Sequence, residues 1–165
     1  MPAILFVCTA NRFRSPIAEA YFVRKLSSMR TSDSWTVASA GTWTPTDLPA
    51  HPKAVKAAAK LDLDLSTHRT REVDATLLKI YDLIVVMQQG HKEALELEFP
   101  FVRGKVILLG SLANVPGGEI PDAARDNFVQ PDAAAGMVCA CIDKSFAEIV
   151  RLAANQQGSH PPSKT

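Results

Sequence analysis

Apolar and polar positions divide the chain into short apolar runs separated by segments of helical character. Residues 3–7 form a continuous apolar run of the length expected for a strand buried on both faces. Residues 35–39, 83–87 and 105–109 have strand-like composition and predict three further strands. Strands that alternate with helices pair in parallel, and helices then cover both faces of the sheet. The pattern therefore predicts an α/β fold.

Helical segments are predicted between these strands. The first is expected to have Ser15 as its N-cap and Pro16 as its first residue, where the missing N–H of proline costs nothing. Four apolar positions would form its buried face: Ala18, Phe22, Leu26 and Met29. The other predicted helices cover residues 52–61, 73–80, 90–97 and 131–154.

Length and charge narrow the class of protein. With 165 residues, of which 47% are hydrophobic, the chain has enough apolar material for one core. We expect one domain over residues 1–154, followed by a polar, proline-rich and disordered tail at residues 155–165. A monomer is favoured. The net charge of +1 provides no field suited to nucleic acid.

Two features indicate a cytoplasmic protein without membrane insertion. No apolar stretch approaches the roughly 20 residues that a bilayer-spanning helix needs, and Met1-Pro2 leads directly into the first strand. The three cysteines are an odd number, which fits a reducing compartment. Cys139 and Cys141 lie two residues apart in the last predicted helix and would point in different directions. We expect small apolar residues there, with a redox pair as the alternative.

The candidate chemistry lies in the loop between the first strand and the first helix. Cys8 and Arg14 stand at opposite ends of this loop. Backbone N–H groups at a helix amino terminus lack partners and carry partial positive charge, which suits a dianionic phosphate. That field and Arg14 favour the thiolate of Cys8, and Ser15 is close enough to offer its hydroxyl to the sulfur. We predict a phosphate-ester hydrolase with a cysteine nucleophile, the alternative being a structural Cys8 and an exposed Arg14.

The pattern Cys, five residues, Arg, Ser, Pro at residues 8–16 resembles the loop of the low-molecular-weight protein tyrosine phosphatases. Four further segments resemble the family in the same order, namely residues 39–42, 68–71, 82–87 and 120–122, and the matches extend over residues 3–152. The resemblance implies a three-layer, flavodoxin-like fold with a four-stranded parallel sheet in the order 2-1-3-4. It also implies that the protein hydrolyses the phosphotyrosine of a protein substrate or another aryl phosphate monoester. This reaction would need no cofactor and no metal.

The resemblance assigns roles to three residues. Cys8 would attack phosphorus to form a phosphocysteine, Arg14 would bind phosphate, and Asp122 would protonate the leaving oxygen and later activate water. Asp126 is the alternative acid. The family usually has proline and then aromatic residues after its acid, whereas residues 123–125 here are Ala-Ala-Arg. The closure of this loop and its aromatic wall are therefore open questions.

The same resemblance supplies the binding and supporting residues. The phosphate-binding loop would comprise Thr9, Ala10, Asn11, Arg12, Phe13, Arg14 and Ser15. Asn11 would hold the shape of the loop through side-chain hydrogen bonds, with Ser39 and His68 as its partners. Arg12 and Trp43 would form a rim suited to an acidic phosphotyrosine peptide, the alternative for Trp43 being simple packing of the loop.

Three other polar residues receive no catalytic role from the sequence. Asp82, at the start of the third predicted strand, is expected to be structural. His51 and His91 belong to no motif and are expected at the surface.

The loop departs from the family pattern at Ala10, where glycine is frequent, and at Phe13, where the family often has a second cysteine. Without that cysteine, oxidised Cys8 has no disulfide partner within the loop. Two other functions remain as alternatives. Arsenate reductases of this type need further cysteines between Cys8 and Cys139, where this chain has none. A non-catalytic phosphate- or phosphopeptide-binding module would fit the altered residues 123–125, but it would need neither a thiolate nor an acid.

Overall fold

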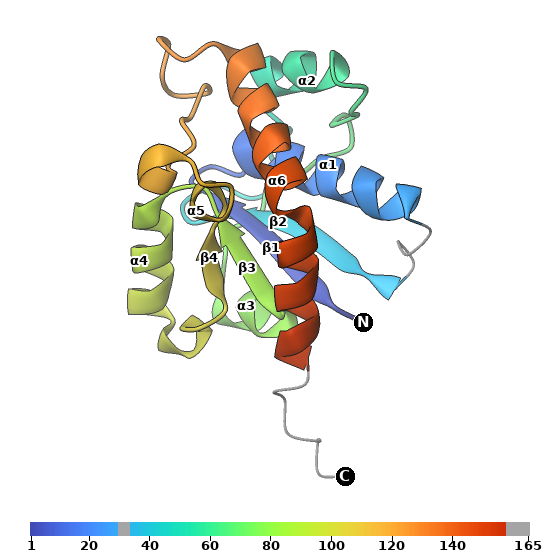
Figure 1. Cartoon of the computed structure of the whole chain (residues 1–165). Helices are drawn as coiled ribbons and strands as arrows, with labels where there is room; N and C mark the ends of the chain where they lie inside the picture. The colour runs from blue at the N-terminus through green and yellow to red at the C-terminus, as the bar shows by residue number, and fades with distance from the viewer. Residues whose placement is uncertain (30–33, 158–165) are drawn as a thin grey trace.

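A computed structural model describes residues 1–29 and 34–157 and contains a four-stranded parallel sheet in the order β2-β1-β3-β4 (Figure 1). The strands are β1 (Ala3–Cys8), β2 (Thr36–Gly41), β3 (Leu83–Val86) and β4 (Val106–Leu108). The predicted fold class and strand order are confirmed. All six residues of β1 are buried, as expected for a central strand with helices on both faces.

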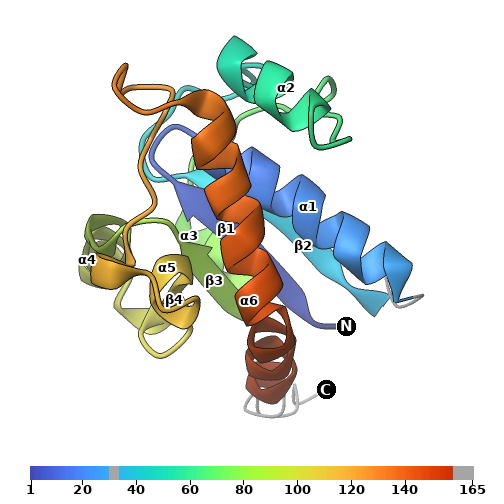
Figure 2. The same cartoon turned by 45° about the horizontal axis from the view of Figure 1, so that its top comes forward.

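Two groups of helices cover the sheet (Figures 1 and 2). One face carries α1 (Arg14–Ser28), α2 (Pro52–Ala59), α5 (Leu109–Leu112) and α6 (Pro131–Gln157). The other carries α3 (Ala75–Ile80), α4 (Gln89–Glu98) and the short 3-10 helix η2 (Pro100–Val102), and a second 3-10 helix, η3, spans Pro116–Gly118. Alternate residues of β1 enter the two cores: Ile4 and Phe6 face α1 and α6, and Leu5 and Val7 face α3 and α4.

The start of α1 corrects the sequence prediction. The helix begins at Arg14 with Phe13 as its N-cap, so Ser15 and Pro16 lie inside the first turn. The hydroxyl of Ser15 instead accepts a hydrogen bond from the side chain of Asn11, at 2.9 Å, and does not cap the helix. At the other end, Met29 is 55% exposed at the C-cap and does not belong to the buried face.

The last helix is longer than predicted. α6 continues to Gln157, three residues into the segment that was expected to be a disordered tail. Residues 158–165 of that expected tail lie outside the described residues. Among residues 1–29 and 34–157, no helix combines the length and the apolar character needed to cross a membrane.

The strand order determines where a ligand can bind. β1 leads to β2 on one side of the sheet, and the chain then crosses to β3 on the other side of β1. Connections that diverge in this way leave a crevice beyond the carboxyl end of the central strand. Cys8 is the last residue of β1 and stands at that point.

Candidate active site

The carbonyl groups of the loop after β1 point outward and are bound by neighbouring segments. Cys8 O accepts from Thr42 N at 2.9 Å, Thr9 O from Trp43 N at 3.0 Å and Arg12 O from His51 N at 2.8 Å, while His68 Nε2 contacts Asn11 O at 2.7 Å. The N–H groups of residues 9–14 donate to no other group in residues 1–29 and 34–157. A loop whose carbonyls are engaged and whose N–H groups are free is a cradle for an anion.

Asn11 holds the centre of this cradle. Its backbone has φ 53°, in the left-handed region that asparagine tolerates better than most residues. Its side-chain nitrogen donates to Ser39 Oγ and Ser15 Oγ, both at 2.9 Å, and its side-chain oxygen accepts from Arg71 N at 3.0 Å. The structure thus brings Ser39 to the side chain of Asn11 and His68 to its carbonyl oxygen.

Gly41, at the end of β2, allows the loop to lie against the sheet. A Cβ atom at this position would stand 2.6 Å from Thr9 O and 2.9 Å from Thr44 Cγ2. Distances below 3.0 Å do not occur for real Cβ atoms, so a side chain here would displace the loop. Gly41 therefore sets the closest approach between β2 and the anion cradle.

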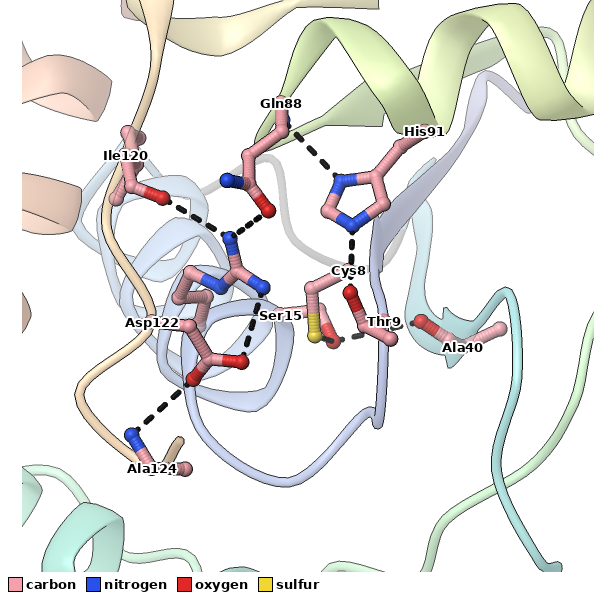
Figure 3. Close-up of polar contacts among 10 residues, drawn as sticks. Cys8, Thr9, Ser15, Ala40, Gln88, His91, Ile120, Asp122 and Ala124 are labelled. Carbon is pink, nitrogen blue, oxygen red and sulfur yellow. Dashed lines mark hydrogen bonds and ion pairs between the residues drawn. The ribbon is translucent and has the colours of Figure 1, made fainter. Parts of the chain in front are cut away.

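Cys8 is buried and its sulfur lies 3.0 Å from Ser15 Oγ (Figure 3). Ser15 Oγ accepts a hydrogen bond from the side chain of Asn11. As a donor, the hydroxyl has one possible acceptor besides the sulfur, namely Ala40 O, which is farther away at 3.4 Å. Its single hydrogen can therefore be donated to the sulfur of Cys8. Such a donor stabilises a thiolate, which is the nucleophilic form of cysteine.

Arg14 is 1% exposed and its guanidinium is held from three directions (Figure 3). Nη1 donates to Gln88 Oε1 at 2.8 Å and to Ile120 O at 2.9 Å, and Nη2 pairs with Asp122 Oδ2 at 3.1 Å. Nε is buried and has no hydrogen-bond partner among the residues that the structure describes. A buried donor left unpaired is costly, and an oxyanion in the cradle would satisfy it.

The side chain of Asp122 is 15% exposed, so most of its surface is buried. One carboxylate oxygen contacts Arg14, and the other accepts from Ala124 N at 3.1 Å (Figure 3). The alternative acid, Asp126, is exposed and uses Oδ1 to accept from Phe128 N at 2.9 Å. The structure therefore brings Asp122 to Arg14, whereas the side chain of Asp126 accepts its hydrogen bond within a local turn.

His91 is not at the surface, which corrects the sequence prediction. It is 6% exposed at the start of α4, and its Nδ1 accepts from Gln88 N at 3.2 Å. Nε2 therefore carries the proton and donates to Thr9 Oγ1 at 2.8 Å (Figure 3). Burial and the positive charge of Arg14 lower the pKa of His91 to about 4, so the ring is neutral near pH 7.

The side chains of Asp82 and His51 make structural contacts. Asp82 Oδ2 accepts from Ala3 N at 2.8 Å and ties the start of β3 to β1, a structural contact. His51 is half-buried and caps α2, with Nδ1 accepting from Lys53 N at 3.1 Å.

Cys139 and Cys141 are free thiols buried in α6. Burial raises the pKa of Cys139 to about 11, so this thiol stays protonated near pH 7. Both behave as small apolar residues in the core. No cluster of three or more potential metal-ligating side chains occurs in residues 1–29 and 34–157.

Two aromatic side chains border the site. Trp43 is 71% exposed, which argues against simple packing of the loop, and Arg12 Nε donates to Pro49 O at 3.0 Å. Phe128 is 98% exposed in the loop between η3 and α6. Phe128 was not among the residues predicted from the sequence, because it stands six positions beyond Asp122.

Residues 3–150 match the family described as low molecular weight phosphotyrosine protein phosphatase. The Wzb protein of Salmonella typhimurium, a low molecular weight protein-tyrosine-phosphatase, is 40% identical over 122 residues, which are 74% of this chain and 76% of that protein. Wzb of Vibrio vulnificus, solved with benzylphosphonate, is 30% identical with a TM-score of 0.78 and covers 90% of this chain and 98% of its own. The YwlE arginine phosphatase, solved as a variant with a phosphorylated active-site serine, is 25% identical with a TM-score of 0.81 over 91% of this chain and 99% of its own.

Proposed function

Because the chain belongs to the low molecular weight phosphotyrosine protein phosphatase family, we propose that it hydrolyses phosphotyrosine or other aryl phosphate monoesters through a phosphocysteine intermediate. The observation that carries this proposal is the buried Nε of Arg14, which, like the N–H groups of the adjacent loop, has no partner in the part of the chain that the structure describes. Together these donors match the equatorial oxygens of a phosphoryl group next to the sulfur of Cys8.

The first step forms a bond between Cys8 Sγ and phosphorus as the bond from phosphorus to the leaving oxygen breaks. The loop N–H groups and Arg14 hold the three equatorial oxygens, so the thiolate attacks in line with the leaving group. The phosphoryl group competes with Asp122 for Arg14, and Asp122 takes up a proton from solvent before it acts as the acid. Asp122 then gives its proton to the leaving oxygen.

The second step returns the enzyme to its starting state. Asp122, now ionised, accepts a proton from a water molecule as the water oxygen attacks phosphorus. The bond between phosphorus and sulfur breaks, and inorganic phosphate leaves. Ser15 supports this departure because its hydroxyl lies 3.0 Å from the sulfur and can donate to the thiolate as its charge returns.

The proposal is tested by steady-state hydrolysis of an aryl phosphate across pH, in the presence of a metal chelator. Cys8→Ser should abolish turnover yet still bind phosphate. Asp122→Asn should slow the reaction about 100- to 10,000-fold, most for poor leaving groups, and should remove one limb of the pH profile. Asp126→Asn is the matched control and should keep the wild-type rate.

Different failures of this assay have different meanings. Normal turnover by Cys8→Ser would reject the cysteine mechanism, and loss of the acid limb in Asp126→Asn would transfer the acid role to Asp126. Phosphate binding without any turnover would favour the non-catalytic module. Since YwlE is an arginine phosphatase of the same fold, phosphoarginine is included as a second substrate, and a preference for it would overturn the aryl specificity.

A further inference from the structure

The beginning of α4 contacts both ends of the phosphate cradle. Gln88, just before the helix, reaches Arg14 at the far end of the loop, and His91 reaches Thr9, the residue after the nucleophile (Figure 3). His91 is buried and neutral, and the two reaction steps above make no use of it. Both ring nitrogens of this buried side chain have hydrogen-bond partners, which indicates a defined structural task.

The two ring nitrogens of His91 have different tasks. Nδ1 accepts from Gln88 N and so completes the cap of α4, while Nε2–H donates to Thr9 Oγ1. The Thr9 hydroxyl uses one lone pair to accept this bond, so the hydrogen of the hydroxyl points away from the imidazole ring. Thr9 O is separately fixed by Trp43 N at 3.0 Å, so both the backbone and the side chain of Thr9 are held.

We propose that His91 is a positioning residue for catalysis, which acts through the hydroxyl of Thr9 to hold in place the loop residue that follows Cys8. The inference rests on the proposed hydrolysis. The neutral ring is essential, because a protonated Nδ1 would direct a second hydrogen at the N–H of Gln88. The charged groups that bear on His91 are Arg14 from α1 and, from the loop before Asp122, Glu119 together with Asp122 itself.

Two substitutions separate the capping task from the positioning task. In His91→Asn the side-chain oxygen can still accept from Gln88 N, but the shorter side chain no longer reaches Thr9. In His91→Gln the longer amide can still donate to Thr9, but the cap on Gln88 is lost. We expect kcat to fall about tenfold in His91→Asn, with KM little changed, and to remain near wild type in His91→Gln.

Thr9→Val provides the second half of the test. It should lower kcat as much as His91→Asn, and the double variant should lose no more than either single variant, because both remove the same contact. Glu93→Ala, an exposed substitution on α4, is the control. A wild-type kcat in His91→Asn, or losses that add in the double variant, would overturn the proposal. Failure of the wild-type protein to turn over any phosphate ester would instead reject the proposed function.

A second inference rests on a separate feature, a hollow of about 520 Å³ beside Asp122. Its walls include Gln88 and Asp122, both of which contact Arg14, so the hollow begins where the phosphate site ends. Phe128 also lines it. Because the acid must reach the leaving oxygen, the group attached to that oxygen has to extend along Asp122 into this space.

The loop that carries Phe128 is built around local hydrogen bonds. Asp126 N donates to Asp122 O at 2.9 Å, and Phe128 N donates to Asp126 Oδ1 at 2.9 Å. Lys53, on α2, contacts Ala123 O at 3.4 Å. The exposed ring of Phe128 is therefore attached to a loop with defined contacts, next to the proposed acid.

The geometry points to Phe128 as an aromatic wall for the ring of an aryl phosphate, because Phe128 and Asp122 line the same hollow. This inference also rests on the proposed hydrolysis. Aromatic rings stack in offset or edge-on arrangements, and such a contact contributes to the binding of the ring without touching phosphorus. Phe128 would therefore set the preference for aryl over alkyl esters.

The test compares KM for an aryl phosphate, KM for a small alkyl phosphate and inhibition by inorganic phosphate. Phe128→Ala should raise KM for the aryl ester about fivefold, leave kcat unchanged and leave the other two constants unchanged. Phe128→Tyr should behave as wild type. Leu97→Ala removes another exposed apolar side chain, 80% exposed on α4, and should change nothing. An unchanged aryl KM in Phe128→Ala, or an equal rise for alkyl and aryl esters, would overturn this role while the hydrolysis itself remained measurable.

Discussion

At the scale of single residues, the site depends on which polar atoms are satisfied and which are left free. Asn11 uses both ends of its amide and its carbonyl oxygen for contacts within the protein. Arg14 keeps one buried donor without a partner among residues 1–29 and 34–157. The residues that shape the cradle are therefore saturated, and the free donors belong to the groups that would face a phosphate.

His91 makes the stability of the protein depend on pH. Its pKa is about 4 in the folded protein against an ordinary value of 6.5, so between these values the unfolded chain binds a proton that the folded chain excludes. The stabilisation from the neutral ring is fully present above pH 6.5 and is lost as the pH falls toward 4, by up to about 3 kcal/mol.

Urea unfolding at pH 7 and pH 4.5 measures this contribution. The wild-type free energy of unfolding should fall more steeply between the two pH values than that of His91→Gln, in which the titrating group is absent. If the free energy of unfolding fell equally in the two proteins, protonation of His91 would have no effect on stability.

Phe13 bears on how Cys8 is expected to respond to oxidation. It is 2% exposed and occupies the position where related loops often carry a second thiol, while Cys139 and Cys141 are buried in α6. We expect peroxide to convert Cys8 to sulfinic and sulfonic acids that thiols do not reduce. Mass spectrometry of treated protein checks this, and full recovery of activity through a disulfide from Cys8 to either buried cysteine would contradict it.

At the scale of elements, the site is formed where the end of β2 meets the loop after β1. Gly41 pairs with Cys8 across the sheet, and its missing side chain leaves room for Thr9 O. Packing between these two segments therefore limits the shape of the cradle more directly than the composition of the loop does.

Gly41→Ala tests this contact. The added carbon would lie 2.6 Å from Thr9 O, so the loop must shift, and we expect kcat/KM to fall at least about tenfold with a loss of about 1–3 kcal/mol in stability. Gly136→Ala is the control, because a Cβ atom there has nothing within 4 Å inside α6. It should be neutral or stabilising. Equal activity of the two variants would show that the close approach at Gly41 is unimportant.

The sequence predicted helices and strands well where their apolar residues recur periodically. It predicted them less well where tertiary contacts determine a helix start or the burial of a side chain. The strands and long helices follow from apolar runs, and their order followed from the family resemblance. The predicted start of α1 was wrong, because the Ser15 hydroxyl bonds to Asn11 and Phe13 is the N-cap. The burial of His91 was missed because its partners, Gln88 N and Thr9 Oγ1, are brought together only by the fold.

At the scale of the whole molecule, an anion in the cradle connects both halves of the chain. Arg14 belongs to α1, whereas its present partners Gln88, Ile120 and Asp122 follow β3 and η3. A ligand that binds only this assembled site stabilises the folded state by mass action.

Thermal unfolding with a phosphate-like oxyanion measures that stabilisation. At 100 times its dissociation constant the ligand should add about 2.7 kcal/mol, which corresponds to a rise in Tm of about 5–10 °C. Cys8→Ser should retain the shift because it keeps the cradle. Arg14→Lys should lose most of it, since lysine cannot make two parallel hydrogen bonds. An unchanged Tm of the wild-type protein at saturating oxyanion would contradict the assignment of the cradle.

The outward carbonyls of the cradle also have a consequence for the newly made chain. Cys8 is among the first residues to be synthesised, but the groups that bind the loop carbonyls and the side chain of Asn11 arrive much later, the last of them being the backbone N–H of Arg71. A nascent chain that has formed only β1 and α1 therefore carries a cysteine without its anion site. The backbone of the cradle therefore gains its last contact only after residue 71 has joined the fold, and Arg14 gains its ion pair only after Asp122 has been added.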